Sequence, residues 1–270
     1  MEPLVSVISK ALGDNLLGVI VYGSSTSPGD HSPLSDLNIA VIVREKIPVE
    51  TKAFLMEKLG PDVSPLFLTV EDLRQLIESG EFIAHEVVRG GKILYADERV
   101  SEVMSKLPPL NQRTRDYLRS HSLACLGLSL ENYFSGRYSQ ALNYAFKSLR
   151  SACRFIAAGE SQVLLSDREI VDFLGAKGMA GAKEVYLQLR DARFKGVKKG
   201  ELFPLIVGAL KTSLTVLGIN SQYLEAALEV VEKEFRWVSD VKVRPGPPGS
   251  ELRVSGVDLK GNVKEVSLPL

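Results

Sequence analysis

The segment LLGVIVYGS, residues 16–24, is followed after a loop by the segment DLNIAVIV, residues 36–43. Each contains a short apolar run of the kind that forms a buried strand. The first run passes into a Gly-Ser-Ser sequence at residues 23–25, whose small side chains favour a tight turn. Residues 25–35 are rich in Ser, Pro and Gly and predict a loop. We therefore expect the two runs to pair as a β-hairpin with a long tip.

The sequence around this hairpin alternates between helical and strand patterns. Thr69 with an acid three residues later marks a helix start, and Gly90-Gly91 marks a turn. We expect helices at residues 3–13, 51–59, 70–79 and 83–88, and further strands at 63–68 and 92–95. Together these elements predict a mixed sheet with helices.

Two prolines at positions 108 and 109 break this pattern, and helical periodicity follows to about residue 238. Helices are expected at residues 112–134, 138–158, 167–174, 180–195, 201–217 and 221–237. The sequence PGPPG at 245–249 then separates two alternating segments joined at Gly261-Asn262. The predicted fold class is α+β, with a mixed sheet and helices in residues 1–106, an all-α helical bundle in residues 111–238, and a short C-terminal β hairpin in a β-rich tail, residues 239–270.

The composition excludes several classes of protein. The chain has 270 residues, of which 45% are hydrophobic and 24% charged, as in folded globular proteins. Its 33 basic and 33 acidic residues balance, so the surface as a whole is not a phosphate-binding field, although a local patch can hold a nucleotide. Cys125 and Cys153 lie in predicted helices and fit core positions in a reducing compartment. No apolar run reaches membrane-spanning length, so we expect a cytoplasmic protein without a membrane partner.

Polar residues lie at the ends of the two N-terminal strands, in an arrangement compatible with chemistry on phosphates. Asp36 and Asn38 are two positions apart on a strand and therefore project from the same face. Phosphoryl transfer needs a divalent cation held by oxygen ligands, which Asp36 can supply. A Gly23-Ser24 turn lets backbone N–H groups approach a triphosphate without a clashing Cβ. Asp36 can equally be an ordinary surface residue at the start of a strand.

The order Gly23-Ser24, eleven loop residues, then Asp36-Leu37-Asn38 resembles the signature of the DNA polymerase β-like nucleotidyltransferase superfamily. The resemblance covers roughly residues 14–95. It implies transfer of a nucleoside monophosphate from a nucleoside triphosphate to an unidentified hydroxyl acceptor, with release of pyrophosphate.

The same resemblance implies a set of site residues and a cofactor. Asp36 and Asn38 would be the catalytic residues, with Asp36 binding Mg²⁺ and Asn38 completing its shell. The nucleotide would be bound by Gly23, Ser24, Ser25 and Arg44, the last lying just beyond the strand that begins at Asp36.

The chain departs from the family pattern at two positions. Asn38 stands where the second carboxylate is expected, and the third strand offers Ser64 or Pro65 where a third acid is expected. The nearest acids in sequence are Asp62, Glu71 and Asp72. An alternative hypothesis is therefore a catalytically inactive fold that acts as a nucleotide-binding or regulatory module. The sequence alone leaves open whether the chain is an enzyme.

The helical part resembles the HEPN domain, which accompanies minimal nucleotidyltransferases in toxin–antitoxin pairs. Active HEPN ribonucleases need an Arg and a His a few residues apart; Arg115 and His121 have that spacing but lie in the first helix of the bundle. We therefore interpret His121 as a core or interface residue and expect no RNA cleavage. The bundle also offers an apolar face through which two copies could form a homo-oligomer. A drug-modifying enzyme similar to the aminoglycoside nucleotidyltransferases is a third hypothesis, because it shares the domain order.

Basic residues also line one helix of this predicted bundle. Lys147, Arg150 and Arg154 share a face of the helix at 138–158. They are either a solvated basic stripe or a source of positive charge for a nucleotide or a nucleic-acid acceptor.

Overall fold

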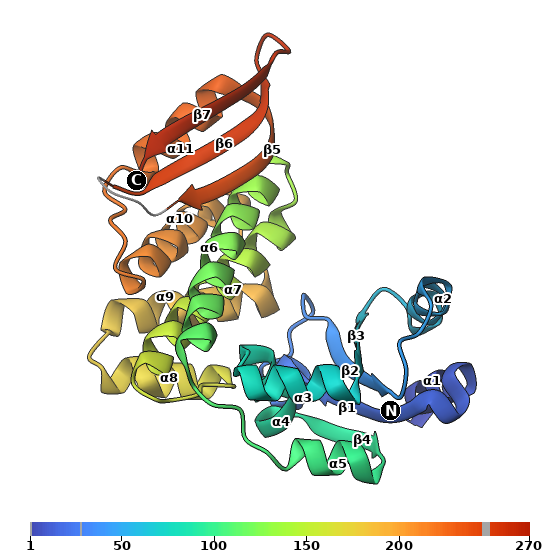
Figure 1. The fold of residues 1–270 in the computed structure, drawn as a ribbon. Helices are drawn as coiled ribbons and strands as arrows, with labels where there is room; N and C mark the ends of the chain where they lie inside the picture. Colours follow the sequence, from blue (N-terminus) through green and yellow to red (C-terminus); the bar gives the residue numbers. More distant parts are fainter. Residues whose placement is uncertain (1, 28, 245–248) are drawn as a thin grey trace. The chain divides into compact units, whose positions relative to one another are not determined.

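The computed structural model describes residues 2–27, 29–244 and 249–270, which form two compact units (Figure 1). The first unit spans the chain up to Thr114 together with residues 165–167, and the second contains the remainder. Pro28 and residues 245–248, which carry most of the predicted PGPPG separator, lie outside the described residues. The predicted α+β fold class is confirmed.

A mixed sheet forms the centre of the first unit, and its order among the described strands is β3-β2-β1-β4. β1 pairs antiparallel with both β2 and β4, whereas β2 pairs parallel with β3. The predicted hairpin of the first two strands is therefore confirmed. The strands span Leu16–Tyr22 (β1), Leu37–Val43 (β2), Val63–Thr69 (β3) and Lys92–Ala96 (β4).

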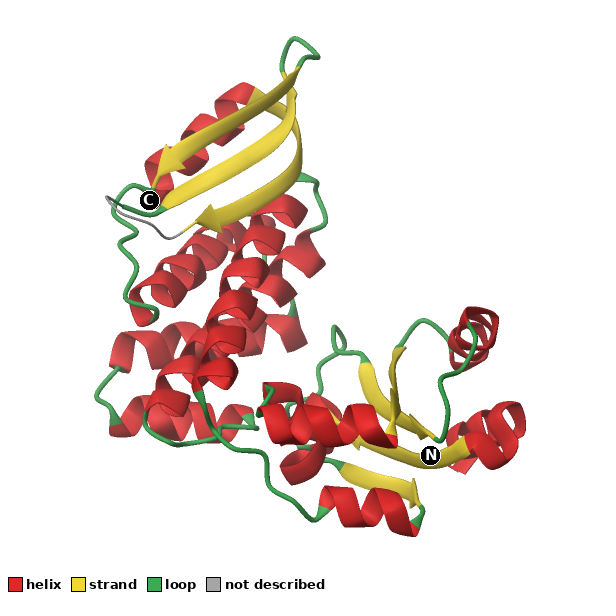
Figure 2. Ribbon diagram, in the orientation of Figure 1, coloured by secondary structure: helices red, strands yellow, loops and turns green. Residues whose placement is uncertain are grey.

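Helices cover both faces of this sheet (Figure 2). Apolar residues of α3, α4 and α5 pack on one face, and those of α1 and α2 pack on the other. All seven residues of β1 are buried as a result, which explains why its sequence is apolar without alternation. The helices span Glu2–Leu12 (α1), Val49–Leu59 (α2), Val70–Ser79 (α3), Phe82–Gly90 (α4) and Glu98–Met104 (α5).

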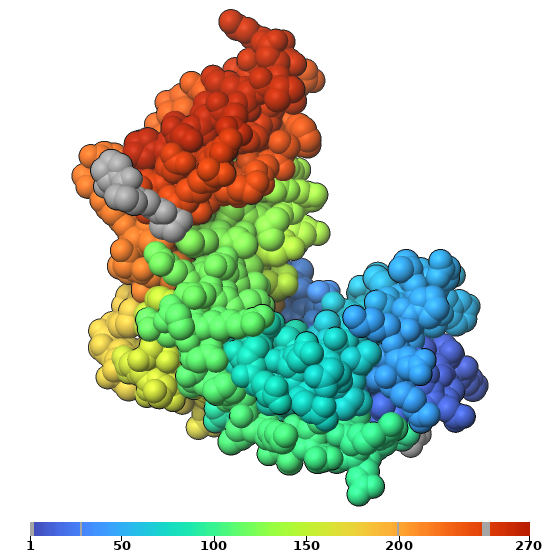
Figure 3. Space-filling model, in the orientation of Figure 1, coloured from blue at the N-terminus to red at the C-terminus, as the bar shows by residue number. Residues whose placement is uncertain are grey.

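The second unit combines helices with an antiparallel sheet of order β5-β6-β7 among its described strands. The C-terminal strands (red) lie directly on helices of the same unit (Figure 3), and both contribute to one hydrophobic core. The helices span Gln112–Phe134 (α6), Tyr138–Gly159 (α7), Asp167–Ala176 (α8), Ala180–Lys195 (α9), Lys199–Val216 (α10) and Leu224–Glu234 (α11). The strands span Phe235–Arg244 (β5), Glu251–Asp258 (β6) and Val263–Pro269 (β7).

Small polar residues join α6 to α7 in this core. The Ser122 hydroxyl donates to the Ser148 carbonyl at 2.8 Å, and the Ser148 hydroxyl donates in return to the Ser122 carbonyl at 2.9 Å. Ser129 likewise donates to the Ala141 carbonyl at 2.8 Å. Because these serines are buried, leaving one without its partner would cost roughly 1–3 kcal/mol.

The two cysteines are buried free thiols, as expected for core positions. Burial raises the pKa of Cys125 to about 11 and that of Cys153 to about 12, so both stay protonated at neutral pH. In the part of the chain that the structure describes, no helix combines the length and apolarity needed to span a bilayer.

The helix predicted at 221–237 is wrong at its C-terminal end, because α11 ends at Glu234 and β5 follows at once. The first buried residues of β5 are Phe235, Val238 and Val241, and their spacing of three also fits a helix. Two irregularities in the pairing with β6 produce this spacing. Each bulge adds a residue to the normal alternation, so the periodicity of the sequence resembles that of a helix.

Gly127 on α6 provides a test of how α6 meets this sheet. A Cβ on Gly127 would lie 2.1 Å from the Val241 carbonyl oxygen, whereas a Cβ on Gly208 of α10 meets nothing within 4 Å. We expect Gly127→Ala to lower the free energy of unfolding by roughly 1–3 kcal/mol because of this overlap. Gly208→Ala, the control, should raise it by about 0.5–1 kcal/mol through helix propensity. Denaturant unfolding measures both values, and a Gly127→Ala protein as stable as the wild type would contradict the close approach.

Candidate functional site

A turn over Gly23–Thr26 follows β1 at the edge of the sheet where β1 ends and β2, β3 and β4 begin, and the predicted site residues lie at this edge. Gly23 has a φ of +78°, a left-handed conformation that favours glycine. The Thr26 hydroxyl donates to the Gly23 carbonyl at 2.8 Å, and the Ser25 hydroxyl donates to the last carbonyl of β1 at 3.3 Å. The Ser24 hydroxyl has no hydrogen-bond partner among the described residues. Ser25 thus stabilises the turn, whereas no described residue uses the Ser24 hydroxyl.

Asn38 lies directly against this turn. It pairs with Tyr22 in the β1–β2 register, and a Cβ on Gly23 would lie 3.2 Å from the Asn38 amide nitrogen. Asn38 is half-buried, and Asp36, one residue before β2, is exposed. Strand alternation places both side chains on the face that α3, α4 and α5 cover. The structure therefore brings five of the predicted site residues together: Gly23, Ser24 and Ser25 in the turn, with Asp36 and Asn38 beside it.

The neighbouring strand places a serine, and not an acid, beside Asn38. Because β2 and β3 run parallel in register, Ser64 is the direct neighbour of Asn38. The Leu37 N–H donates to the Asp62 carbonyl at 2.8 Å, which puts Asp62 next to Asp36. Asp62 and Ser64 are both exposed.

The other two acids considered from the sequence lie at the far end of β3. Thr69, where β3 ends, is five residues beyond Ser64, or roughly 17 Å at about 3.3 Å per residue. Asp72 accepts a hydrogen bond from the Thr69 N–H at 2.9 Å in a capping box, and these contacts with Thr69 hold the pKa of Asp72 below its usual value. Glu71 pairs with Arg74 at 2.6 Å. Neither carboxylate can share a cation with Asp36.

The donor set at this edge does not fit a centre that holds two cations. Across the described residues, no three His, Cys, Asp or Glu side chains are grouped so that they could hold a metal ion. The described strands bring the carboxylates of Asp36 and Asp62 to this edge, whereas Asn38 and Ser64 offer neutral oxygens. Divalent cations in phosphoryl-transfer sites are held by carboxylates whose charge offsets their own. Mg²⁺ bound to Asp36 stays a prediction.

The structure does not bring Arg44 to the turn. Arg44 follows the last residue of β2, so the full length of that strand separates it from Asp36. Eight residues at about 3.3 Å each correspond to roughly 26 Å. Its backbone N–H instead donates to the Asn15 carbonyl at 2.9 Å at the opposite edge of the sheet.

Two basic residues that sequence reasoning missed lie at the same edge of the sheet as the turn. Lys92 is the first residue of β4 and pairs with Val21, one residue before the end of β1. Arg89 lies in the last turn of α4, a helix that contacts the Gly23–Thr26 turn. Both side chains are exposed, and neither forms an ion pair within the described part of the chain. Only the β1–β4 register reveals their position, because about seventy residues separate them from the turn in sequence.

His85 on α4 is a buried titratable group beneath this region. It is fully buried, and neither ring nitrogen has a hydrogen-bond partner among the residues described. Burial lowers its pKa, and the nearby charge of Arg89 lowers that pKa further. The Pro109 carbonyl lies close enough to oppose this shift in part, although it lies outside hydrogen-bonding geometry. His85 is therefore neutral in the folded protein at neutral pH.

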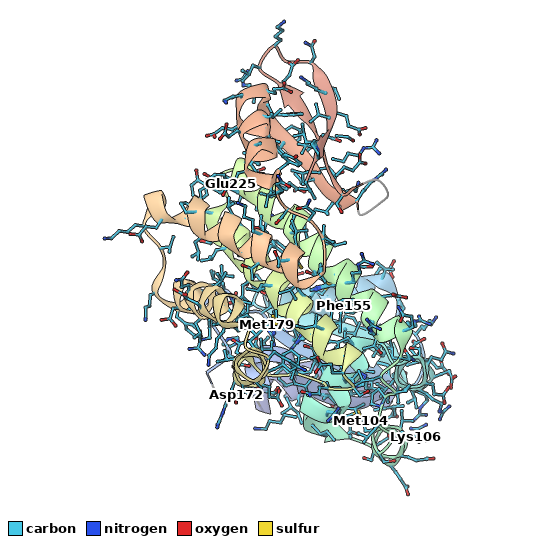
Figure 4. All side chains as sticks on the ribbon, turned by 90° about the vertical axis from the view of Figure 1, so that its left-hand side faces the viewer. Met104, Lys106, Phe155, Asp172, Met179 and Glu225 are labelled. Atoms are coloured by element: carbon cyan, nitrogen blue, oxygen red, sulfur yellow. The ribbon has the colours of Figure 1, made fainter. Side chains whose placement is uncertain are left out.

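The candidates in the helical unit are engaged in its packing. The His121 Nδ1 lies 2.8 Å from the Ser151 hydroxyl, and its ring stacks on Tyr117 at 5.7 Å. Arg115 lies over the ring of Phe155, which Figure 4 labels on α7, at 5.1 Å. Arg154 is buried with 6% of its surface exposed, so the predicted basic face of this helix is not a solvated stripe throughout.

Comparison with solved structures identifies the fold. Spectinomycin adenyltransferase AAD(9) from Enterococcus faecialis, solved with ATP and spectinomycin, has a TM-score of 0.56 and 14% identity, covering 80% of this chain and 99% of its own. At this identity the likeness shows the fold alone, and the chain has a nucleotidyltransferase-like fold. The predicted nucleotidyltransferase-like fold is thereby confirmed, whereas membership of the superfamily and the HEPN-like bundle stay predictions.

Two further similarities are too weak to carry an argument. A nucleotidyltransferase-like protein from Exiguobacterium sibiricum 255-15 is 17% identical and covers 100% of this chain and 99% of its own, with a TM-score of 0.32. The toxin–antitoxin complex MntA-HpeT is 16% identical and covers 38% of this chain and 83% of its own, with a TM-score of 0.28. No protein-family model and no curated protein matches the chain.

The contact between the turn and Asn38 can be tested with two glycines of the same connection. Gly23 and Gly29 have φ values of +78° and +84°, but only a Cβ on Gly23 meets a neighbour, the Asn38 amide. We expect Gly29→Ala to cost about 1 kcal/mol of stability through backbone strain. Gly23→Ala should cost more, roughly 2 kcal/mol, because Asn38 must also move. Equal decreases in the free energy of unfolding of the two variants, measured by denaturant unfolding, would show that Asn38 is not in close contact with the turn.

The pH dependence of stability tests the environment of His85. Its pKa is lowered in the folded state, so the unfolded chain takes up a proton first as the pH falls below about 6.5. The first unit should therefore lose stability from about pH 6.5 down to the lowered pKa, with no His85 effect above that window. His85→Phe removes the titration and should flatten this part of the profile. An unchanged slope in the variant would rule out His85 as its source.

Proposed function

We propose that the first unit binds a nucleoside triphosphate at the Gly23–Thr26 turn and does not transfer its nucleotidyl group. The binding half of this proposal is supported by the turn itself. Its backbone is free of a Cβ at Gly23, and Ser24 has a hydroxyl that no described residue uses. Ser24 and the turn N–H groups are donors suited to phosphate oxygens.

One observation carries the second half of the proposal, the pairing of Asn38 with Ser64 on adjacent strands. Transfer with two cations needs carboxylates at this level, and both positions are neutral. Two like unit charges about 4 Å apart repel by roughly 4 kcal/mol at an effective dielectric of about 20. A site that keeps Asp36 and Asp62 but lacks the other acids therefore attracts cations less, and repels an unaccompanied triphosphate less, than a site with three acids.

Nucleotidyl transfer to an acceptor hydroxyl is the second candidate function. The retained turn, Asp36 at the start of β2, and the fold shared with AAD(9) favour it. In that case Asp36 would hold Mg²⁺, with Asp62 as the adjacent acid. The HEPN-like bundle and a toxin–antitoxin-like role stay predictions. The ring of His121 contacts Ser151 and Tyr117 and therefore offers no support for RNA cleavage.

A binding assay and a transfer assay on the same protein test the proposal. Nucleoside triphosphates should raise the melting temperature of the wild type, and Ser24→Ala should weaken binding about 10- to 100-fold through loss of one hydrogen bond to a charged group. Ser101→Ala, an exposed helical serine on α5, is the control and should bind as the wild type does.

The transfer assay uses α-labelled triphosphates with Mg²⁺ or Mn²⁺, and either the protein itself or cell extract as acceptor. We expect no incorporated label. Label that appears with the wild type and disappears with Asp36→Ala would overturn the proposal in favour of the transferase.

A further inference from the structure

The proposed nucleotide site raises the question of what neutralises the phosphates. A triphosphate carries several negative charges, and nucleotidyl transfer sites pair them with divalent cations held by carboxylates. The carboxylates that β2 and β3 bring to this edge are those of Asp36 and Asp62, and both are exposed. Positive charge must therefore come from the protein if a divalent cation is not retained.

The edge of the sheet carries opposite charges on its two sides. In the order β3-β2-β1-β4, the strand ends bring Asp62, then Asp36 and Asn38, then the turn after β1, and finally Lys92. The two acids thus lie on the β3 side of the turn. The basic side chains of Arg89 and Lys92 lie on the β4 side of the turn.

The connection that carries these cations is held firmly against β1. A Cβ on Gly91 would lie 2.8 Å from the Ile20 Cγ2 on β1, so the backbone at Gly91 packs closely against that strand. Arg89 lies two residues before Gly91, on the helix that covers the Asn38 face, and Lys92 follows Gly91 at the open end of the sheet. Both side chains are exposed and without an ionic partner among described residues.

Asn38 completes this arrangement. Its amide nitrogen lies against the turn, 3.2 Å from where a Gly23 Cβ would be, and its side chain has no hydrogen bond to any residue described. An amide can donate to a phosphate oxygen, whereas a carboxylate at the same place would repel it unless a cation lay between them.

From this geometry we infer that the site binds the triphosphate without a divalent cation, with Arg89 and Lys92 supplying the counter-charge and Asn38 a neutral donor. The inference rests on the proposed nucleotide-binding function and names the form of the ligand, a metal-free nucleoside triphosphate. Arg89 contributes more than Lys92, because α4 lies on the same face of the sheet as Asn38, whereas Lys92 pairs with Val21, whose side chain packs on the other face.

Calorimetric titration with ATP, GTP, CTP and UTP, each in excess EDTA and again with Mg²⁺, tests the inference. One of the four triphosphates will bind the wild type most tightly, and its affinity should be similar in EDTA and in Mg²⁺. Arg89→Gln should weaken binding in EDTA by about 5- to 20-fold, the loss expected for a charge-assisted contact, and Lys92→Gln should weaken it by a smaller factor of about 2- to 5-fold. Lys46→Gln removes an exposed lysine just beyond the opposite end of β2 and should bind as the wild type does.

Asn38→Asp supplies a second, independent measurement on the same site. It should bind about tenfold more weakly than the wild type in EDTA and recover affinity when Mg²⁺ is added. Thermal unfolding of each variant verifies that it is folded.

The outcomes separate this inference from the function on which it rests. Binding that requires Mg²⁺ in the wild type would overturn the inference and leave nucleotide binding intact. The same conclusion would follow if Arg89→Gln and Lys92→Gln bound the triphosphate as well as Lys46→Gln does. No binding of any of the four triphosphates in either buffer would overturn the proposed function itself, and the inference with it.

Discussion

The antiparallel pairing of β1 with β2 is the constraint on which the rest of the N-terminal unit depends. It sets Tyr22 opposite Asn38, so the chain must leave β1 through a turn that lies against the Asn38 side chain. A residue without a Cβ adopts the left-handed conformation there without strain and without displacing Asn38, and Gly23 provides it. The parallel pairing of β2 with β3 and the antiparallel pairing of β1 with β4 then bring Asp62, Ser64 and Lys92 to the same edge. The composition of the candidate site is therefore a consequence of strand register.

Much of this arrangement can be predicted from the sequence, because the strands are short apolar runs with small-residue turns between them. The departures at Asn38 and Ser64 are visible in the sequence for the same reason, since a strand's period of two assigns each residue to a face. Arg44 shows the limit of this reasoning. It is close to Asp36 in sequence, yet an extended strand carries the chain away from the site by roughly 3.3 Å with every residue.

The remaining features depend on contacts between distant segments. Arg89 and Lys92 reach the turn only through the pairing of β4 with β1, and nothing local in their sequence indicates that register. The start of β5 was predicted to be helical because two bulges space its buried residues by three. Arg154 is basic and lies on a helix, properties typical of a surface residue, yet the packing around it buries its side chain. Tertiary packing decides each of these cases, and periodicity alone cannot.

The polar residues of the candidate site lie outside the hydrophobic cores, so changing them has little effect on the stability of the fold. The fully buried residues that β2 contributes to the two cores of the first unit begin at Ile39 and Ala40. Asp36 and Asn38 precede them, at the N-terminal end of the strand. On β3, Ser64 is exposed and the buried Leu68 lies four residues further on. Exchanging a carboxylate for an amide or hydroxyl at this edge therefore removes little packing and uncovers little apolar surface. A nucleotidyltransferase-like sheet can consequently carry neutral side chains at this edge and still keep its strand register and its glycine turn, which is the combination found in this chain.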